Sequence, residues 1–366
     1  MSHSRKVFFG LVLLASQLSY AFPEMIRHGY VNCTSCHVSP GGGGVLTEYG
    51  HELSKELLST WSRENESKFV WGILKQPAWL NMGGDFRDVF LYQDTQTFRQ
   101  LDLILMQADI EANLKYQKFD FVGTFGYKET KLPTALRQHM ISRRHYLMAH
   151  LSDEISFRAG RFQPVYGLGV PDHAVSIKRG LGWDQEMESY NLEGAYVGEK
   201  ANFYFTGILG RPDATELKRE KGFSTQFGIP FMERYKVGGS LFYGQNELEH
   251  RTVYGPWAQL GLLSSLVLLS EFDFQSQVQK NSVNQFGWVT FEKLDYEWFQ
   301  GLHTFVSHQH ERPDFKNDLT YFQVFGVGAQ WFPRPHFEFV LTYEKRDANV
   351  PGRDADWIYL MNHFYF

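Results

Sequence analysis

Residues 106–127 read MQADIEANLKYQKFDFVGTFGY, and this stretch decides the fold. Apolar and polar residues alternate from Met106 to Tyr116, and the alternation resumes from Phe119 to Tyr127 after a break at Gln117. A period of two means that one face of an extended chain is apolar and the other is wet. The stretch therefore predicts two antiparallel β-strands joined by a tight turn.

The same alternation recurs along residues 79–366. A soluble sandwich also alternates, but its strands are usually about 5–6 residues long. The segments here are closer to the ~9–11 residues that a tilted strand needs to cross a bilayer. At about 18 residues per strand and connection, the region predicts an all-β transmembrane β-barrel of about sixteen antiparallel strands. Further predicted strands lie at 203–209, 235–243, 285–291, 296–305, 321–331, 337–343 and 357–366.

The expected connections differ in length. Those near residues 117, 152 and 199 are short, whereas the connections over 163–189, 211–233 and 309–318 are long. Outer-membrane barrels have short periplasmic turns and long outer loops. The aromatic-rich residues 357–366, which finish on Phe366, look like the last strand of such barrels. Both features predict a bacterial outer-membrane protein.

Composition agrees with this interpretation. Aromatic residues make up 16% of the 366 residues, and the net charge is −5. After residue 21 no apolar run reaches the ~18 residues of a spanning helix. The charge is mild and no basic block occurs, so we expect no nucleic-acid partner.

The first residues have the organisation of a secretory signal. Arg5 and Lys6 precede a short apolar core at 7–14, and small residues precede a cleavage point after Ala21. The apolar core is shorter than the ~20 residues of a membrane anchor. We therefore expect a signal peptide over 1–21, a module over 22–78 and the barrel over 79–366.

The only two cysteines lie in Cys33-Thr34-Ser35-Cys36-His37, which matches the C-x-x-C-H attachment signature of a c-type haem. Cys33 and Cys36 would form thioethers with one haem c, and His37 would ligate its iron. A zinc site needs about four ligands, and no second cysteine pair exists. A thioredoxin-like motif needs a βαβ context. A plain disulfide stays an alternative.

The rest of the module predicts one amphipathic helix after a glycine-rich turn at residues 41–44. The small module is thus expected to be α-helical, with its apolar stripe either covering a haem face or packing on the barrel. We place His51 on the polar side and expect it to be solvated. The stripe consists of Leu46, Tyr49, Leu53, Leu57 and Trp61.

The sixth position of the iron stays open at this stage. His28, His51 and Met82 are the candidates near the motif, and a five-coordinate iron is a further alternative. Methionine would raise the reduction potential relative to histidine.

Two groups of residues in the barrel region predict possible sites less specifically than the haem motif does. A group of basic residues would either form the basic lining of a pore or bind haem propionates. The run His308-Gln309-His310, with Glu311 and Asp314, predicts a solvated loop, with a transition-metal site as the alternative. The basic group comprises Arg143, Arg144, His145, Arg158, Arg161, Lys178 and Arg179.

The leader resembles the fused monohaem cytochrome–porins of bacterial outer membranes, the group that includes iron-oxidising cytochromes. The resemblance covers residues 22–53 and rests on Phe22-Pro23-Glu24-Met25-Ile26-Arg27, on the haem motif, and on Leu46-Thr47-Glu48-Tyr49-Gly50. That family often has Arg where this chain has His51. The resemblance implies haem attachment at Cys33 and Cys36 and iron ligation by His37.

The resemblance also implies a function. We expect electron transfer between a periplasmic carrier, such as a cytochrome, and an extracellular donor or acceptor, with ferrous iron as one donor. A porin-type transport channel with a haem plug or sensor is the alternative. An enzyme that turns over a small ligand at an open iron site is a third hypothesis.

Overall fold

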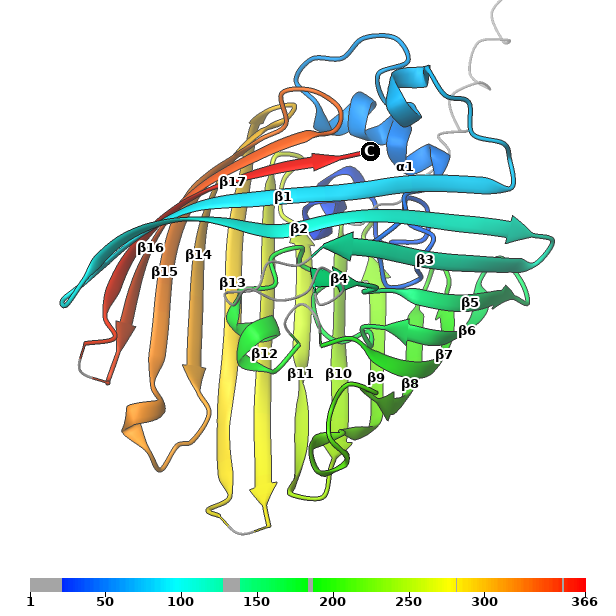
Figure 1. The fold of residues 1–366 in the computed structure, drawn as a ribbon. Coiled ribbons are helices and arrows are strands. Elements are labelled where there is room, and N and C mark those ends of the chain that lie inside the picture. Colours follow the sequence, from blue (N-terminus) through cyan, green and yellow to red (C-terminus); the bar gives the residue numbers. More distant parts are fainter. Residues whose placement is uncertain (1–21, 128–138, 184–186, 281, 351) are drawn as a thin grey trace, which may run out of the picture.

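The computed structural model describes residues 22–127, 139–183, 187–280, 282–350 and 352–366. The expected signal peptide, 1–21, lies outside the described residues. The structure is a closed barrel of sixteen antiparallel strands (Figure 1). The first strand, β1 (Leu80–Thr95), closes it by pairing with both β2 (Arg99–Tyr116) and the last strand, β17 (Ala355–Tyr365). The short strand β4 (Met140–Ile141) and β5 (His145–His150) both pair with β3 and count as one strand of the barrel wall. The predicted barrel and its strand number are confirmed.

The remaining strands follow one another around the barrel in chain order, each antiparallel to the next. They are β3 (Phe119–Tyr127), β6 (Ile155–Phe162), β7 (Ser189–Val197), β8 (Asn202–Gly210), β9 (Lys221–Phe231), β10 (Tyr235–Gln245), β11 (Glu249–Gly261), β12 (Leu266–Gln279), β13 (Gln285–Phe299), β14 (Leu302–Arg312), β15 (Phe322–Trp331) and β16 (Phe337–Ala348).

The barrel wall is amphipathic with its apolar face outward. Along β7, Asn191 and Glu193 are buried while Leu192 is 55% exposed. Along β3, Asp120 is buried while Phe121 is exposed. A soluble protein would bury the aliphatic and aromatic side chains instead, so the outer surface faces lipid. A closed barrel satisfies its backbone hydrogen bonds within the wall, as a membrane-spanning sheet must. These properties are those of a bacterial outer-membrane barrel.

Several expected boundaries are corrected. The long connection over 211–233 contains a strand, β9. The segment 296–305 straddles the turn at residues 300–301 between β13 and β14. His308, Gln309 and His310 lie in β14 and not in a loop. At β9 and in β14 the alternation continues through residues whose polarity predicts a connection, because inward-facing strand positions of a barrel are polar as well. At 296–305 the alternation runs on across a tight turn, so it predicts one strand where the chain forms two.

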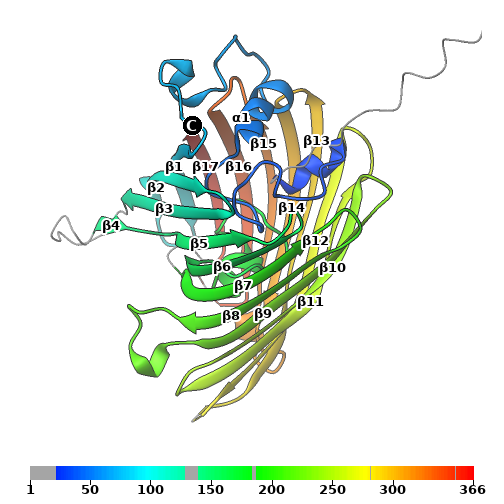
Figure 2. The ribbon, with the colours of Figure 1, turned by 90° about the vertical axis from the view of Figure 1, so that its right-hand side faces the viewer.

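The N-terminal module sits in the mouth at the end of the barrel that carries the short turns (Figure 2). By the usual topology this is the periplasmic end. Its helical segments are η1 (Pro23–His28), α1 (Glu48–Leu53), which continues as the π-helical turn η2 (Ser54–Leu58), and η3 (Phe69–Gly72). The predicted amphipathic helix thus corresponds to α1 and η2. In the described residues, no helix is both long and apolar enough to cross a membrane.

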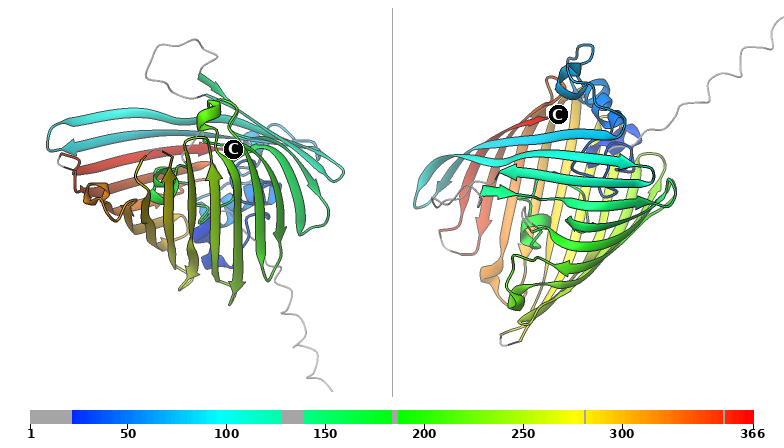
Figure 3. Two further views of the ribbon diagram at one scale, coloured as in Figure 1. Left: turned by 90° about the horizontal axis from the view of Figure 1, so that it is seen from below. Right: turned by 45° about the vertical axis from the view of Figure 1, so that its right-hand side comes forward.

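A second segment fills the lumen from the wall. Residues 163–183, expected as an outer loop, fold back inside the barrel and include the short helical turn η4 (Ser176–Gly180). Further views show the strands closing around this segment and the blue module (Figure 3). The outer connections of the remaining strands carry η5 (Glu216–Lys218) and η6 (Asp318–Thr320). The infolded segment packs against inward-facing apolar residues of β10–β13, namely Phe242, Val253, Trp257, Val267, Leu269, Val289 and Phe291.

Candidate functional site

The motif residues form a tight turn beside one internal cavity. The carbonyl of Cys33 accepts hydrogen bonds from the backbone N–H groups of Cys36 (3.2 Å) and His37 (3.0 Å). Cys33, Cys36 and His37 all line a cavity of about 350 Å³, which is within the usual size range of ligand sites. The two cysteines are not joined in a disulfide. The turn therefore directs two thiols and one imidazole toward a common space.

Helix α1 supports the turn directly. The hydroxyl of Thr47 donates to the Ser35 carbonyl (2.6 Å) and accepts from the Gly50 N–H (3.1 Å), which caps the helix. A Cβ atom at Gly50 would lie 2.5 Å from the Cys36 carbonyl oxygen, so the helix approaches the motif backbone too closely for any side chain. The order of motif, turn and helix in the sequence thus produces a packed unit.

The glycine-rich loop after the motif orients the His37 ring. Val38 N–H donates to Val45 O (3.1 Å), which folds the loop back beside the motif. The Nδ1 atom of His37 lies 3.3 Å from the Gly44 carbonyl oxygen. Donation of the Nδ1 proton to this carbonyl leaves Nε2 with the lone pair that a metal needs. Burial lowers the pKa of His37 to about 4, so the ring is neutral at physiological pH.

The loop that carries the motif is also fixed to the barrel wall. Lys236 of β10 donates to the Val31 carbonyl oxygen (2.6 Å). Tyr204 of β8 donates its hydroxyl proton to the Pro40 carbonyl oxygen (3.0 Å). Asn32 donates to the carbonyl of Gly198, in the short turn between β7 and β8 (3.2 Å). These bonds on both sides of the motif hold the cysteines in a fixed position.

Helix η1 is anchored by buried charges. Arg27 forms an ion pair with Asp295 of β13, and both side chains are fully buried. Its neighbour Glu24 pairs with Lys293 at 2.7 Å. His303 of β14 lies 3.1 Å from Asp295 on the other side. Each charge thus has a counter-charge, as buried ions require.

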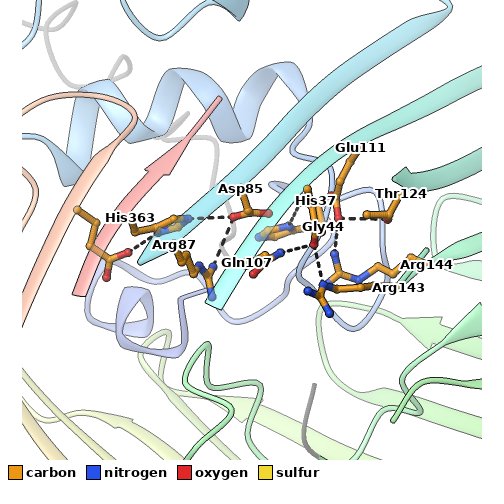
Figure 4. A network of polar contacts seen from close by, with 12 residues as sticks. His37, Gly44, Asp85, Arg87, Gln107, Glu111, Thr124, Arg143, Arg144 and His363 are labelled. Atoms are coloured by element: carbon orange, nitrogen blue, oxygen red, sulfur yellow. Dashed lines mark hydrogen bonds and ion pairs between the residues drawn. The ribbon is translucent and has the colours of Figure 1, made fainter. Parts of the chain in front are cut away.

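The cavity wall is richer in positive than in negative side chains. Among the residues that the structure describes, six lysines and arginines line it, compared with three carboxylates, although the chain as a whole has a net charge of −5. Strand carboxylates bind three of these arginines. Glu111 pairs with Arg144 (Figure 4). Asp109 pairs with Arg143 and Glu193 with Arg158. The lining cations are Arg87, Arg143, Arg144, Arg158, Lys178 and Lys236, and the lining anions are Asp85, Glu111 and Glu188.

Only part of the predicted basic group, which is close together in the sequence, lines the cavity in the structure. Arg143, Arg144, Arg158 and Lys178 line the cavity, whereas Arg161, Arg179 and His145 are not among its lining residues. His145 Nε2 instead lies 2.7 Å from the Tyr190 hydroxyl at an exposed position.

The expected candidates for the sixth ligand all lie outside the cavity lining. His28 is near Glu297 at the rim, with 3.4 Å between Nε2 and the carboxylate. Met82 lies in β1. The prediction that His51 is solvated is wrong, because α1 turns this side chain toward the barrel end and buries it, and burial lowers its pKa to about 4. The imidazoles that do line the cavity are His37, His173 and His363.

The predicted metal alternative at 308–311 finds no support in the geometry. His308 pairs with Glu292 at 2.9 Å. Gln309 points inward and accepts a hydrogen bond from the Ser176 N–H at 2.8 Å. Among the described residues, no group of three histidines, cysteines or carboxylates is arranged to hold a metal ion.

Sequence reasoning missed the residues that the barrel brings to the motif from far along the chain. Asp85 of β1 and His363 of β17 lie beside His37, and His363 bridges Asp85 (2.9 Å) and Glu338 (2.7 Å) (Figure 4). Each sits at an inward strand position, where a polar residue is the rule. The register between β1 and β17, which the sequence does not supply, decides that they meet.

Comparisons with known proteins support the fold. No family model matches the chain, and no curated protein does. Solved outer-membrane porins are similar: the outer-membrane expressed OmpT of Vibrio cholerae (TM-score 0.59, 10% identity, 80% of this chain and 100% of that one) and Salmonella typhi OmpF in complex with daunomycin (0.59, 11%, 78% and 97%). An anion-selective porin from Comamonas acidovorans matches equally well (0.59, 8%, 78% and 99%). The chain therefore has a porin-like barrel.

Proposed function

We propose that this chain is an outer-membrane electron-transfer protein with one haem c attached inside the periplasmic end of a porin-like barrel. Cys33 and Cys36 would hold the group covalently, and His37 would ligate the iron through Nε2. The observation that carries the proposal is the convergence of both thiols and a neutral, oriented imidazole on one internal cavity. Bound there, the haem would supply a one-electron carrier.

The charges of the cavity wall also suit the group. Haem carries two propionate carboxylates, and arginine is the side chain best suited to carboxylates. The described lining residues include six cations, from β1, β6, β10, η4 and the residues between β4 and β5, and three carboxylates; Arg143 and Arg158 are also paired with Asp109 and Glu193, which lie outside the lining. A bare charged cofactor would be unstable in hydrocarbon, whereas the barrel encloses this cavity in a polar wall.

The chain would exchange electrons with partners on the two sides of the membrane. The motif lies at the periplasmic end, which favours a periplasmic electron carrier as one partner. An extracellular donor or acceptor, with ferrous iron as one candidate donor, would be the other. One haem is shorter than the ~30 Å hydrocarbon core, so the infolded segment 163–183 must lie on the route to the outer mouth.

The test begins with covalent attachment. We expect the exported protein to show the mass of one tetrapyrrole and a c-type haemochrome spectrum, and Cys36→Ala to lose covalent haem while the barrel still assembles. A redox titration of the purified protein with ferrous iron then tests the donor. An exported wild-type chain without added tetrapyrrole would refute the proposal.

A porin-type transport channel is the second candidate, and the similarity to solved porins favours it. In that case the module would be a plug or a sensor. Solute flux through the purified protein in liposomes separates the two functions. Flux at the level of an open porin, equal in wild type and Cys36→Ala, would support the channel.

A further inference from the structure

The chain between the N-terminal module and the first strand passes over the rim of the barrel at its periplasmic end (Figure 1). This stretch, residues 60–79, is called the rim segment below. It contains η3 and joins η2, inside the mouth, to β1 in the wall. Its side chains contact β15 and β17, which come from the other end of the sequence.

The start of the rim segment packs on the outer side of the wall. Trp61 meets Trp331, the last residue of β15, edge to face, with 5.8 Å between the ring centroids. The Trp331 indole N–H also donates to the Thr60 hydroxyl at 3.1 Å. Because Gln330 and Phe332 on either side are both buried, the alternation of the strand turns Trp331 away from the lumen. Trp61 therefore lies beside a lipid-facing residue.

The middle of the rim segment makes a similar contact at β17. Trp71 stacks on Phe364, with 6.1 Å between the ring centroids and 20° between the ring planes. His363 and Tyr365 line the internal cavity, so Phe364 between them faces outward. Its partner in the neighbouring strand is the exposed Phe86 of β1. The rim segment thus continues the lipid-facing surface of the barrel wall over the rim.

The rim segment buries its polar side and exposes its apolar side. Glu66 is buried in its ion pair with Arg334, and Ser67 is buried as well. Ile73 and Leu74, in contrast, are 77% and 56% exposed. A segment whose surroundings were water would favour the opposite arrangement, and large exposed apolar patches mark interaction sites. The exposed large apolar side chains are Trp61, Trp71, Ile73, Leu74 and Trp79.

The backbone of the rim segment is strained next to these side chains. Val70 (φ +48°) and Trp71 (φ +54°) are consecutive residues in the left-handed region, which is unfavourable for β-branched and bulky side chains. Such strain persists only where the surroundings stabilise it, and it is concentrated in functional segments. Trp71 is still 44% exposed in the protein, so a partner outside the chain would complete its contacts.

A phospholipid surface has the chemistry that fits this partner. Tryptophan is enriched where the hydrocarbon of a membrane meets the headgroups, and outer-membrane barrels carry aromatic girdles at that level. Arg63, Lys68 and Lys75 are exposed in the rim segment, compared with one exposed acid, Glu64. Exposed bases beside an apolar surface strengthen binding to anionic lipids.

From this arrangement we propose that the rim segment is an interfacial anchor, whose exposed apolar side chains insert into the phospholipid of the periplasmic leaflet. Continuity with the lipid-facing wall favours lipid over a protein partner. The anchor would hold the link between module and wall at the membrane surface, and so help to keep the module in the mouth. This inference does not depend on haem attachment.

The experiment uses the full-length protein in vesicles of phosphatidylcholine and phosphatidylglycerol. The vesicles also contain a phosphatidylcholine with a photoreactive diazirine near the top of one acyl chain. After illumination, mass spectrometry maps the lipid adducts along the chain. We expect adducts on the rim segment of the wild type as well as on β7, where the exposed Tyr196 lies close to a periplasmic turn and provides the internal reference.

Variants test the side chains that insert. Ile73→Asn combined with Leu74→Asn should lower the adducts on residues 69–79 several-fold relative to β7, because two exposed apolar side chains become polar. The matched control is Leu319→Asn, which makes the same change at an exposed position of η6 in an outer connection and should leave the ratio unchanged. Heat-modifiable migration in gel electrophoresis shows that each barrel has assembled.

Three results would overturn the proposal. The first is lipid adducts on β7 with none on the rim segment. The second is equal adducts on residues 69–79 in the wild type and the double variant. The third is crosslinking of two copies through Lys68 or Lys75 by an amine-reactive reagent, without lipid adducts there, which would assign the surface to a second copy of the chain. The wild-type map keeps the test decisive if the double variant assembles poorly.

Discussion

Among single residues, Gly44 makes the most specific demand on the site. Its φ of +72° lies in the left-handed region, and a Cβ atom there would lie 2.9 Å from an Arg144 side-chain nitrogen. Its carbonyl also orients His37. The left-handed conformation alone costs an L-residue roughly 1–2 kcal/mol.

Given the haem attachment proposed above, Gly44→Ala is expected to distort the loop and lower the haem content of the exported protein several-fold, while the barrel still assembles. The matched control is Gly352→Ala, which has the same sign of φ (+79°) but no atom within 4 Å of the added carbon. Haemochrome content per barrel measures the effect. Equal haem content in the two variants would show that crowding at Arg144 does not matter.

A second single-residue effect depends on pH. The Arg334 guanidinium, which hydrogen-bonds both carboxylate oxygens of Glu66 (2.6 and 2.7 Å), lowers the pKa of Glu66. Because the pKa of Glu66 is lowered in the folded state, the contact stabilises that state at pH values above the ordinary pKa of a carboxyl group. This stabilisation is lost as the pH falls through the lowered pKa. Arg334 is one-third exposed, so screening limits the contribution to about 1 kcal/mol or less.

Hydrogen exchange of residues 60–68 tests this prediction. We expect the protection factor of these amides, which is the intrinsic exchange rate at each pH divided by the measured rate, to stay constant between about pH 8 and 5 and to fall below about pH 4, where carboxyl groups protonate. Glu66→Gln should show the lower protection factor at all pH values, with no further change in acid. An acid-induced loss of protection of the same size in Glu66→Gln would assign the effect to another group.

On the scale of elements, η1 depends on one buried ion pair. Asp295→Asn would leave the fully buried Arg27 without its main counter-charge, and breaking such a pair typically costs about 3–5 kcal/mol. We expect residues 22–30 to leave the barrel mouth and become protease-sensitive, while β13 and its neighbours stay paired. Limited proteolysis of the folded barrel measures this. Glu56→Gln, at an exposed ion pair, is the control and should change nothing.

The elements also show how much the sequence predicts. Strands were predictable wherever polar and apolar residues alternate without interruption, as in β2 and β3, because the pleat forces alternate side chains to opposite faces. Prediction failed at β9 and at the end of β14, where polar inward positions have the composition of a loop. It also failed for residues 163–183, since their burial depends on apolar residues that β10–β13 present to the lumen.

The residues of the candidate site likewise fall into two groups, those that a local motif predicts and those that the folded barrel brings together. The motif predicts Cys33, Cys36 and His37 as the haem-binding residues, because haem attachment needs those residue types at that spacing. The structure places all three at one cavity, and their binding of haem stays a prediction. The sequence could not give Asp85, His363 or His173, because each is brought to the cavity by barrel closure or by the infolded segment and carries no local spacing signal. Contacts that depend on the register of distant strands are set by the whole barrel and not by a motif.

For the whole molecule, the decisive property is that the barrel mouth and lumen are both occupied by protein. The module packs Met25, Leu53 and Leu58 against Phe332 in the short connection after β15, and the infolded segment fills the space beside β10–β13. A barrel of sixteen strands is wide enough for an aqueous channel when its lumen is open. The N-terminal module in the mouth and the infolded segment in the lumen therefore distinguish this molecule from an open pore of equal size.

We accordingly expect the purified wild-type protein to give a much lower single-channel conductance in planar bilayers than an open sixteen-stranded porin. A variant that combines Asp295→Asn with Glu66→Gln, and so weakens the module's contacts at β13 and at the turn after β15, should give larger and less steady openings, because the module would leave the mouth intermittently. Glu56→Gln should behave as wild type. Full porin-like conductance of the wild type would mean that the module does not block the mouth in the membrane, and would favour the transport function over electron transfer.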